Sequence, residues 1–219
     1  MKTIYTDQHR LRDAQTELYG GELVKPFERP SRADTVIAAV RDSTLGPVEA
    51  PDEFSLDPVL RVHDADFVSF LESAWGEWQA TGYKGEAIAS VWPARRMQCR
   101  VPRFIEGKMG YYALAAETTI TEGTWAAALA SKDVGLTGAK ALVSGEKGVF
   151  SLCRPPGHHA ARDMFGGYCF LNNAAIAAQY LRDQGAERVA ILDIDFHHGN
   201  GTQDIFYERD DVLFCSLHG

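Results

Sequence analysis

Two short segments of the sequence hold the residues most suited to catalysis, and the first of them carries Asp195 and His197. The two residues are two positions apart, so on an extended backbone their side chains point to the same side. A carboxylate and an imidazole offered together suit a divalent transition metal such as zinc. Asp193 shares that face and is placed to orient a ligand or another histidine from behind. The pattern predicts a metal site, and a capped polar turn at a strand end is the alternative for Asp-x-His taken alone.

The second segment is the adjacent pair His158 and His159. It follows a Pro-Pro-Gly run at residues 155–157, which fixes a tight turn and holds both imidazoles in place. Imidazole titrates near neutral pH, so the pair suits general acid and base chemistry around a metal-bound water. Two surface histidines after a turn are the alternative if the pair is considered by itself.

A glycine and aromatic stretch at residues 166–170 follows the histidine pair. Its backbone is able to approach a ligand closely, with aromatic rings beside it, although a simple glycine turn before a helix explains the stretch nearly as well. Other chemistries have weaker support, because the sequence contains no Gly-x-Ser-x-Gly elbow, no Gly-x-Gly-x-x-Gly fingerprint and no phosphate-binding loop.

These segments need elements that bring them together. β-rich runs at residues 148–153, 188–194 and 212–217 alternate with helical patterns at 173–183 and 203–208. This alternation predicts βαβ units and a parallel sheet, because parallel neighbours need a crossover connection. Ligands of such sheets bind beyond the carboxyl ends of the strands, which is where five of the seven histidines of the chain fall.

The first 147 residues show weaker patterns. The expected elements are a strand at 2–6, an irregular segment at 7–30, a helix opened by a capping box at Ser31 and Asp34, a helix from Asp64 to Gly82, an aperiodic loop at 83–109 and helices at about 110–120 and 125–144. A loop as long as 83–109 is uncommon in a compact domain and is typical of a functional or interface segment.

Composition narrows the class of protein. The chain has 219 residues, of which 45% are hydrophobic and 24% are charged, and its formal net charge is −8. This is the composition of a globular protein, and the lack of a basic excess argues against nucleic acid as the main partner. The N-terminus has no apolar run for a signal peptide, no stretch reaches the ~20 apolar residues of a membrane span, and no Cys-x-x-Cys occurs. We therefore expect a cytoplasmic protein without a membrane partner.

The motifs, taken together, resemble the arginase-like histone deacetylase family. The resemblance rests on Arg154-Pro-Pro-Gly-His-His-Ala160, Gly166-Gly-Tyr-Cys-Phe-Leu-Asn-Asn173, Asp193-Ile-Asp-Phe-His-His-Gly-Asn-Gly-Thr202 and Ser216-Leu-His218. Tyr19-Gly-Gly-Glu22, Lys84-Gly-Glu-Ala87 and Ile105-Glu-Gly107 resemble its acetylpolyamine amidohydrolase branch. The resemblance covers essentially the whole chain. It implies a single α/β domain over 1–219, with a mostly parallel sheet, helices on both faces and 83–109 as an inserted loop.

The resemblance also implies a reaction, the hydrolysis of an acetamide on a primary amine with release of acetate. Asp195 and His197 would hold Zn²⁺, with Fe²⁺ as the alternative metal, and His159 would be the general base and acid assisted by His158. Asp193 and Asn200 match the residues that orient the pair, and Asn200 is an acid in many histone deacetylases. A structural K⁺ is expected at Asp193, Asp195, His197, Ser216 and Leu217.

In this family the substrate reaches the metal through a tunnel. The matching residues here are Tyr19, Gly167, Tyr168 and Phe170, and Glu106 and Glu117 are candidates for binding the distal ammonium groups of a polyamine. Members of the polyamine branch form dimers through the inserted loop, so a homodimer through residues 83–109 is expected. The negative net charge agrees with a small polycationic substrate.

One departure from the family pattern concerns the metal. A catalytic zinc takes three protein ligands, and the sequence supplies two. The family's third ligand, an aspartate, and its oxyanion-stabilising tyrosine would follow residue 219. We therefore expect the domain to be truncated at its C-terminus and to need the missing region for activity. The alternatives are a protein acetyl-lysine deacetylase of histone type and a catalytically inactive metal-binding fragment.

Overall fold

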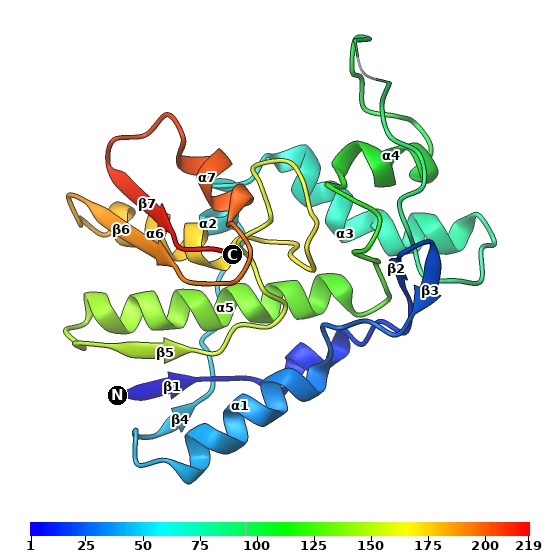
Figure 1. Ribbon diagram of the computed structural model, residues 1–219. Helices are drawn as coiled ribbons and strands as arrows, with labels where there is room; N and C mark the ends of the chain where they lie inside the picture. Colours follow the sequence, from blue (N-terminus) through cyan, green and yellow to red (C-terminus); the bar gives the residue numbers. More distant parts are fainter. Residues whose placement is uncertain (95) are drawn as a thin grey trace.

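The computed structural model describes residues 1–94 and 96–219, and its elements follow one another as shown in Figure 1. The strands are β1 (Lys2–Ile4), β2 (Glu17–Tyr19), β3 (Glu22–Val24), β4 (Val48–Glu49), β5 (Val149–Ser151), β6 (Val189–Asp193) and β7 (Val212–Ser216). The helices are the 3-10 helix η1 (Asp7–Leu11) and the α-helices α1 (Pro30–Asp42), α2 (Asp57–Leu60), α3 (Ala65–Ala80), α4 (Ile105–Tyr112), α5 (Thr124–Val143), α6 (Asn173–Asp183) and α7 (Asn200–Phe206).

The strands form two parallel sheets and one hairpin. One sheet has the order β4-β1-β5 and the other pairs β6 with β7, while β2 and β3 form an antiparallel hairpin. The register places Asp193 at the end of β6 beside Ser216 of β7. The α/β class and the parallel pairing are confirmed. Among the described residues, however, β5 and β6 have no ladder between them, so the three C-terminal strands do not form one continuous sheet.

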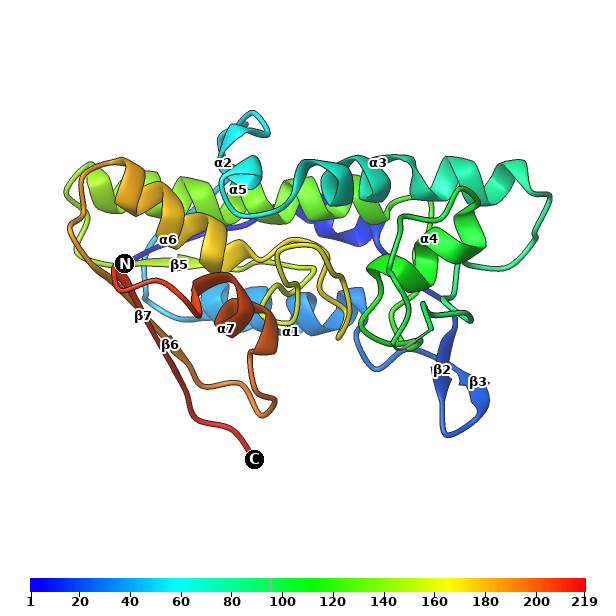
Figure 2. The same ribbon diagram turned by 90° about the horizontal axis from the view of Figure 1, so that it is seen from above.

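Helices cover the β4-β1-β5 sheet from both sides, whereas one face of the β6–β7 pair is exposed at Leu192 and Leu213. Figure 2 shows α5 and α1 on opposite sides of β1 and β5. The α1 side of this sheet buries Tyr5, Ile37 and Val40. A larger core lies among α3, α4, α5, α6 and the loop before α6; its fully buried members include Phe67, Met109, Leu136, Phe165, Phe170 and Ile176. Two-sided coverage is the expected architecture for parallel strands.

Most strongly periodic segments form the predicted elements. The helices expected at 173–183 and 125–144 are α6 and α5, and the aromatic helix after Asp64 is α3. The capping box at Ser31 is wrong, because α1 begins at Pro30 and no side chain caps its N-terminus. A proline at the first helical position has its φ already set for the helix and lacks one of the N–H groups that a cap would satisfy.

Three weaker predictions differ from the structure. The helix expected at 110–120 is α4 and ends at Tyr112, because Ile120 instead forms an antiparallel bridge with Ala87. The segment expected to be irregular at 7–30 contains η1 and the β2–β3 hairpin. The helix expected at 203–208 is α7, which begins at Asn200.

The inserted loop at 83–109 runs from α3 into the first residues of α4, and in Figure 1 it extends away from the two parallel sheets. Arg95, which belongs to this loop, lies outside the described residues. Trp92 anchors the loop by donating from Nε1 to the Ala113 carbonyl at 2.9 Å. Across residues 1–94 and 96–219, no helix is both long and apolar enough to cross a bilayer.

Candidate active site

The turn after β5 carries His158 and His159, whose ring centroids are 4.0 Å apart. Neighbouring elements fix this turn from behind, since Ser131 Oγ and Asn173 Nδ2 donate to the Pro155 carbonyl at 2.8 and 3.1 Å. A Cβ on Gly157 would come within 2.6 Å of the Asn173 backbone nitrogen, so this position requires glycine. The rigid turn predicted from the sequence is therefore present, and close packing maintains it.

Each histidine of the pair is oriented by one acceptor. His158 Nδ1 lies 2.8 Å from Asp193 Oδ2, and His159 Nδ1 lies 2.6 Å from Asn200 Oδ1. A carboxylate or an amide oxygen only accepts, so in both imidazoles Nδ1 carries the proton and Nε2 keeps its lone pair. Asp193 and Asn200, the two residues predicted to orient the pair, thus each contact one of its histidines.

The surroundings of His159 favour its neutral, basic form. Burial lowers the pKa of His159 below its ordinary value, and the hydrogen bond to Asn200 opposes this shift only in part. A neutral imidazole at pH 7 is the form that accepts a proton.

Asp195 and His197 lie on the segment that follows β6, and their side chains are 52% and 69% exposed. The His197 backbone N–H donates to Asp195 Oδ1 at 2.8 Å, and His197 Nδ1 lies 3.4 Å from the same oxygen. Burial acts to raise the pKa of Asp195, but the hydrogen bond from the His197 N–H and the nearby His158 imidazole outweigh it, so the pKa is lowered. An ionised carboxylate beside an exposed imidazole is a donor set that a divalent metal accepts.

The described residues supply this donor set only in part. Across residues 1–94 and 96–219, no group of three His, Cys, Asp or Glu side chains is arranged to hold a metal ion. Asp195 and His197 therefore offer two side-chain donors, whereas a catalytic zinc takes three protein ligands.

The residues predicted for potassium come from two neighbouring strand ends. The Leu217 N–H donates to the Asp193 carbonyl at 2.9 Å, and Asp193 is in register with Ser216. Asp193 Oδ1 also accepts from the Asp195 N–H at 3.1 Å. The parallel pairing of β6 and β7 thus brings four of the five predicted residues, Asp193, Asp195, Ser216 and Leu217, to one end of the sheet.

The turn at residues 166–170 lies directly against His159. Gly167 has φ +54°, and a Cβ there would come within 2.1 Å of His159 Cδ2. Tyr168 follows with φ +66°, a conformation that is uncommon outside glycine. Glu117 Oε1 accepts from the Gly167 N–H at 2.9 Å, which holds the strained turn in place. Three predicted substrate residues, Gly167, Tyr168 and Glu117, are therefore joined to one another beside the histidine pair.

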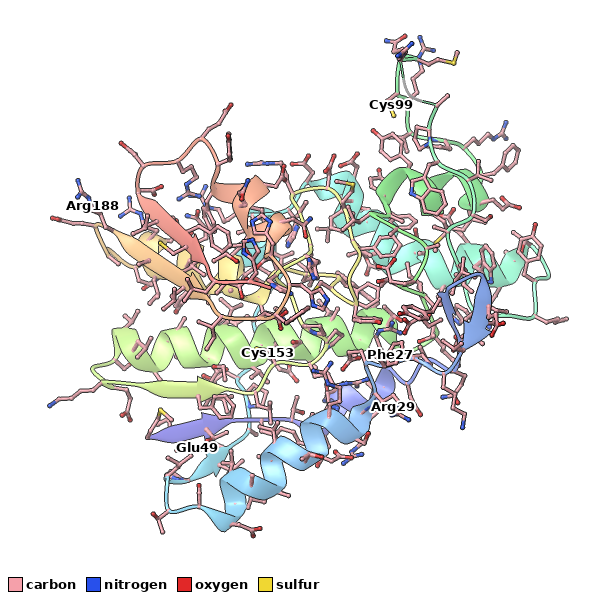
Figure 3. All side chains as sticks on the ribbon, viewed as in Figure 1. Phe27, Arg29, Glu49, Cys99, Cys153 and Arg188 are labelled. Atoms are coloured by element: carbon pink, nitrogen blue, oxygen red, sulfur yellow. The ribbon has the colours of Figure 1, made fainter. Side chains whose placement is uncertain are left out.

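The other predicted substrate residues, Phe170, Tyr19 and Glu106, make different contacts. Phe170 is fully buried, stacks on Phe165 and lies 4.8 Å from the guanidinium carbon of the buried Arg12. Tyr19 is 61% exposed on β2 and packs edge-on against Phe27, which Figure 3 labels beside the hairpin. Glu106 accepts from the Tyr83 hydroxyl at 3.1 Å at the start of α4. In the described part of the chain, no hydrogen bond joins these residues to the histidine pair.

Several supporting contacts were not predicted from the sequence. Arg154 is buried, pairs with Glu28 at 2.8 and 3.0 Å and donates to the His9 carbonyl at 2.6 Å, which ties the histidine turn to the N-terminal segment. Thr118 Oγ1 accepts from the Tyr168 N–H at 2.8 Å, and Glu17 accepts from the Tyr168 hydroxyl. Glu17 lies two residues before Tyr19 on β2, and residues at this spacing share one face of a strand. Had a strand been predicted here, Tyr19 would have indicated Glu17 as a neighbour.

The chain is similar in sequence to proteins that are named acetylpolyamine amidohydrolases. The chain is 60% identical over its full length to an acetylpolyamine amidohydrolase of Mycoplana ramosa and 55% identical to acetylpolyamine amidohydrolase 2 of Pseudomonas aeruginosa. It spans 64% of the length of each of these relatives.

A solved structure of acetylpolyamine aminohydrolase from Burkholderia pseudomallei superposes on the whole chain with a TM-score of 0.93 at 39% identity, and the chain covers 63% of it. The histone deacetylase domain model matches residues 26–219, which include both histidine segments. With this match and the α/β fold shared with the solved relative, the chain belongs to the histone deacetylase domain family.

Proposed function

We propose that this chain carries the histidine pair and two metal ligands of a deacetylase that releases acetate from acetylated polyamines. The observation that carries the proposal is the hydrogen bond from His159 Nδ1 to Asn200, which leaves Nε2 with its lone pair near Asp195 and His197. The names of the relatives and the identity over the full chain support the same activity and substrate class.

In this proposal His159 moves the protons of the reaction. Its Nε2 accepts a proton from the attacking water as the C–O bond forms, and returns a proton to the amine nitrogen as the C–N bond breaks. The products are acetate and a primary amine. His158, held at Nδ1 by Asp193, provides a second oriented imidazole 4.0 Å from His159. Asp195, His197 and a third ligand would hold zinc, or Fe²⁺ as the alternative. The bound metal would act as a Lewis acid that polarises the acetyl carbonyl and lowers the pKa of water.

The substrate in this proposal is a small cation. The net charge of −8 favours attraction of a polyamine. Glu117 offers its Oε1 to the Gly167 N–H, and we assign its second oxygen to a substrate ammonium group, with Glu106 as a further acidic contact.

We also propose a structural K⁺ at Asp193, Asp195, His197, Ser216 and Leu217, and a homodimer through the loop at 83–109. Exposed apolar side chains on this loop support the dimer; they are Val91, Trp92, Met97, Val101 and Phe104. A cavity of about 320 Å³ lies among the residues of the same loop.

The test is an assay of acetate release with zinc, using N-acetylputrescine and an acetyl-lysine peptide in parallel. Because the chain spans 64% of its relatives' length, both the 219-residue chain and the whole polypeptide encoded by its gene are assayed. We expect zinc-dependent turnover of N-acetylputrescine that falls at least about a hundredfold in His159→Ala, since a positioned general base contributes roughly 10²–10⁴-fold.

Two results would overturn this proposal. A clear preference for the peptide would indicate a protein deacetylase. Zinc-dependent turnover in neither polypeptide would indicate an inactive metal-binding chain. Circular dichroism of His159→Ala shows whether the variant is folded, so that loss of activity is not confused with unfolding.

The metal ligands are tested separately by equilibrium dialysis against zinc. Asp195→Asn should lower the zinc affinity at least about tenfold, because a neutral amide is a much poorer zinc ligand than a carboxylate. Asp210→Asn, which alters an exposed aspartate between α7 and β7, is the matched control. Equal zinc binding by both variants would show that Asp195 is not a ligand.

A further inference from the structure

The carboxylate of Glu17 is buried between the β2–β3 hairpin and the turn that carries Tyr168. The residue is 1% exposed. Its Oε1 accepts from the Tyr168 hydroxyl at 2.9 Å, and its Oε2 accepts from the Phe27 backbone N–H at 3.2 Å. No cationic side chain of the described residues forms an ion pair with it. A buried, unpaired carboxylate is costly, so the two hydrogen bonds are what compensate the charge.

These two hydrogen bonds join segments that flank the histidine pair. Tyr168 belongs to the turn that touches His159, and its backbone is held at φ +66° with its N–H on Thr118. Phe27 packs edge-on against Tyr19, with ring centroids 5.5 Å apart. One carboxylate therefore fixes both the hydroxyl end of Tyr168 and the aromatic pair of the hairpin.

The same contact sets the direction of the Tyr168 hydroxyl. An ionised carboxylate only accepts, so the hydroxyl proton points at Glu17 and the oxygen keeps its lone pairs for another donor. Burial raises the pKa of Tyr168 above its ordinary value, and the hydrogen bond to Glu17 raises it further, so the hydroxyl stays protonated. A protonated hydroxyl whose hydrogen is already engaged presents an acceptor to an ammonium group.

We propose that Glu17 is a positioning residue: its carboxylate ties Tyr168 to the hairpin that bears Tyr19 and turns the Tyr168 oxygen into an acceptor for a cationic substrate. The positioning role of Glu17 follows from the geometry alone, whereas the role of the Tyr168 oxygen as an acceptor for substrate rests on the proposed function. Glu17 acts through Tyr168 and is not assigned a contact with substrate.

The positioning is tested by ¹⁹F NMR on the 219-residue chain labelled with 3-fluorotyrosine. Tyr168→Phe and Tyr19→Phe assign the two resonances. In Glu17→Gln both resonances should move, because the amide removes the charge and can no longer accept from both donors. Glu22→Gln changes the same side chain at an exposed position opposite Tyr19 on β3 and should leave the Tyr168 resonance in place. An unchanged Tyr168 resonance in Glu17→Gln would overturn the inference.

The unfolding equilibrium gives a second measurement if Glu17→Gln folds poorly. The effects of Glu17→Gln and Tyr168→Phe on the unfolding constant in urea should be non-additive, since both variants remove the same hydrogen bond. Strict additivity in the double variant would mean that the two side chains are not coupled.

The effect on substrate is measured by calorimetric titration with N-acetylputrescine, and by KM and kcat in whichever polypeptide turns it over. Loss of one charge-assisted hydrogen bond should weaken binding about tenfold and raise KM by a similar factor, with kcat within about twofold. If kcat falls and KM does not rise, the acceptor role is wrong. If the NMR shifts appear but the unaltered protein does not bind N-acetylputrescine, the positioning holds and the proposed substrate fails.

Discussion

In the candidate site, the backbone of Gly167 packs against His159 so tightly that no side chain fits at position 167. A Cβ at residue 167 would meet His159 Cδ2 at 2.1 Å, and the φ of +54° adds strain for any other residue. The glycine therefore serves two purposes, since it permits the turn and leaves room for the imidazole. Glu117 and Thr118 hold the turn from the other side through the backbone N–H groups of Gly167 and Tyr168.

Gly167→Ala should destabilise the fold by about 1 kcal/mol from the left-handed backbone alone, and further because the methyl group displaces His159. Gly82→Ala is the matched control, because Gly82 also has a positive φ but a methyl group there would meet nothing within 4 Å. Urea unfolding of the two variants measures the difference. Equal losses of stability would mean that the turn does not press on His159.

In the proposed mechanism, the hydrogen-bond partner of His159 sets the pH at which His159 can act as the base. Asn200→Asp would place a carboxylate on Nδ1, which stabilises the imidazolium and raises the pKa of His159. The base is active when neutral, so the acidic limb of the pH–rate profile should move to higher pH. An NMR titration of the His159 Hε1 resonance measures the shift directly, and a pKa equal to or below that of the unaltered protein would contradict the assigned hydrogen bond.

At the scale of elements, one buried histidine links the middle of the loop between β5 and α6 to its C-terminal end. His63 Nδ1 donates to the Ala161 carbonyl at 2.8 Å, and its Nε2 accepts from the Asn172 N–H at 3.0 Å. Both ring nitrogens are thus used by a neutral imidazole. Burial lowers the pKa of His63 to about 4, against an ordinary value of 6.5.

This burial predicts acid destabilisation. Above pH 6.5 His63 is neutral in both the folded and unfolded states, so its contribution to stability is complete. As the pH falls from 6.5 toward 4, the unfolded chain binds a proton that the folded chain does not, and roughly 3 kcal/mol of stability is lost. Urea unfolding between pH 7 and 4 measures the slope.

His63→Gln should reduce this slope, although it lowers stability at pH 7 because packing is disturbed. His218→Gln changes an exposed histidine and should keep the slope. A slope that is unchanged in His63→Gln would assign the acid sensitivity to other groups.

At the scale of the whole molecule, apolar side chains are exposed at the end formed by β6 and β7. Leu192, Ile194, Phe196, Leu213 and Leu217 are each more than 60% exposed. A contiguous apolar surface of this kind promotes association. The loop at 83–109 presents a second apolar surface, the one proposed for the homodimer.

Self-association of the 219-residue chain distinguishes these two surfaces. Leu213→Lys should reduce concentration-dependent association if the β6–β7 end drives it, and Phe104→Lys should do so if the loop at 83–109 is the dimer interface. Size-exclusion chromatography with light scattering gives the mass of each variant. Leu60→Lys, at an isolated exposed leucine, is the control. A monomer at every concentration would remove both surfaces as interfaces of this chain.

The sequence by itself determined the family and the alternation of strands and helices after residue 147. Motifs such as Asp193-x-Asp195-x-His197 are contiguous, and the helix at 173–183 has a strong local period, so both are readable over a few residues. The sequence also predicted that the two histidine segments come together at strand ends, and the hydrogen bond of His158 to Asp193 joins them although β5 and β6 share no ladder in the described part of the chain.

Tertiary structure alone decided how the site is held. Glu17 and Tyr168 are 151 residues apart, and Arg154 and Glu28 are 126 apart, so neither contact leaves a local period in the sequence. The end of α4 at Tyr112 likewise depends on the bridge of Ile120 to Ala87, which is a long-range backbone pairing. Local patterns encode elements and contiguous motifs, whereas buried hydrogen bonds between distant segments depend on the packing of the whole chain.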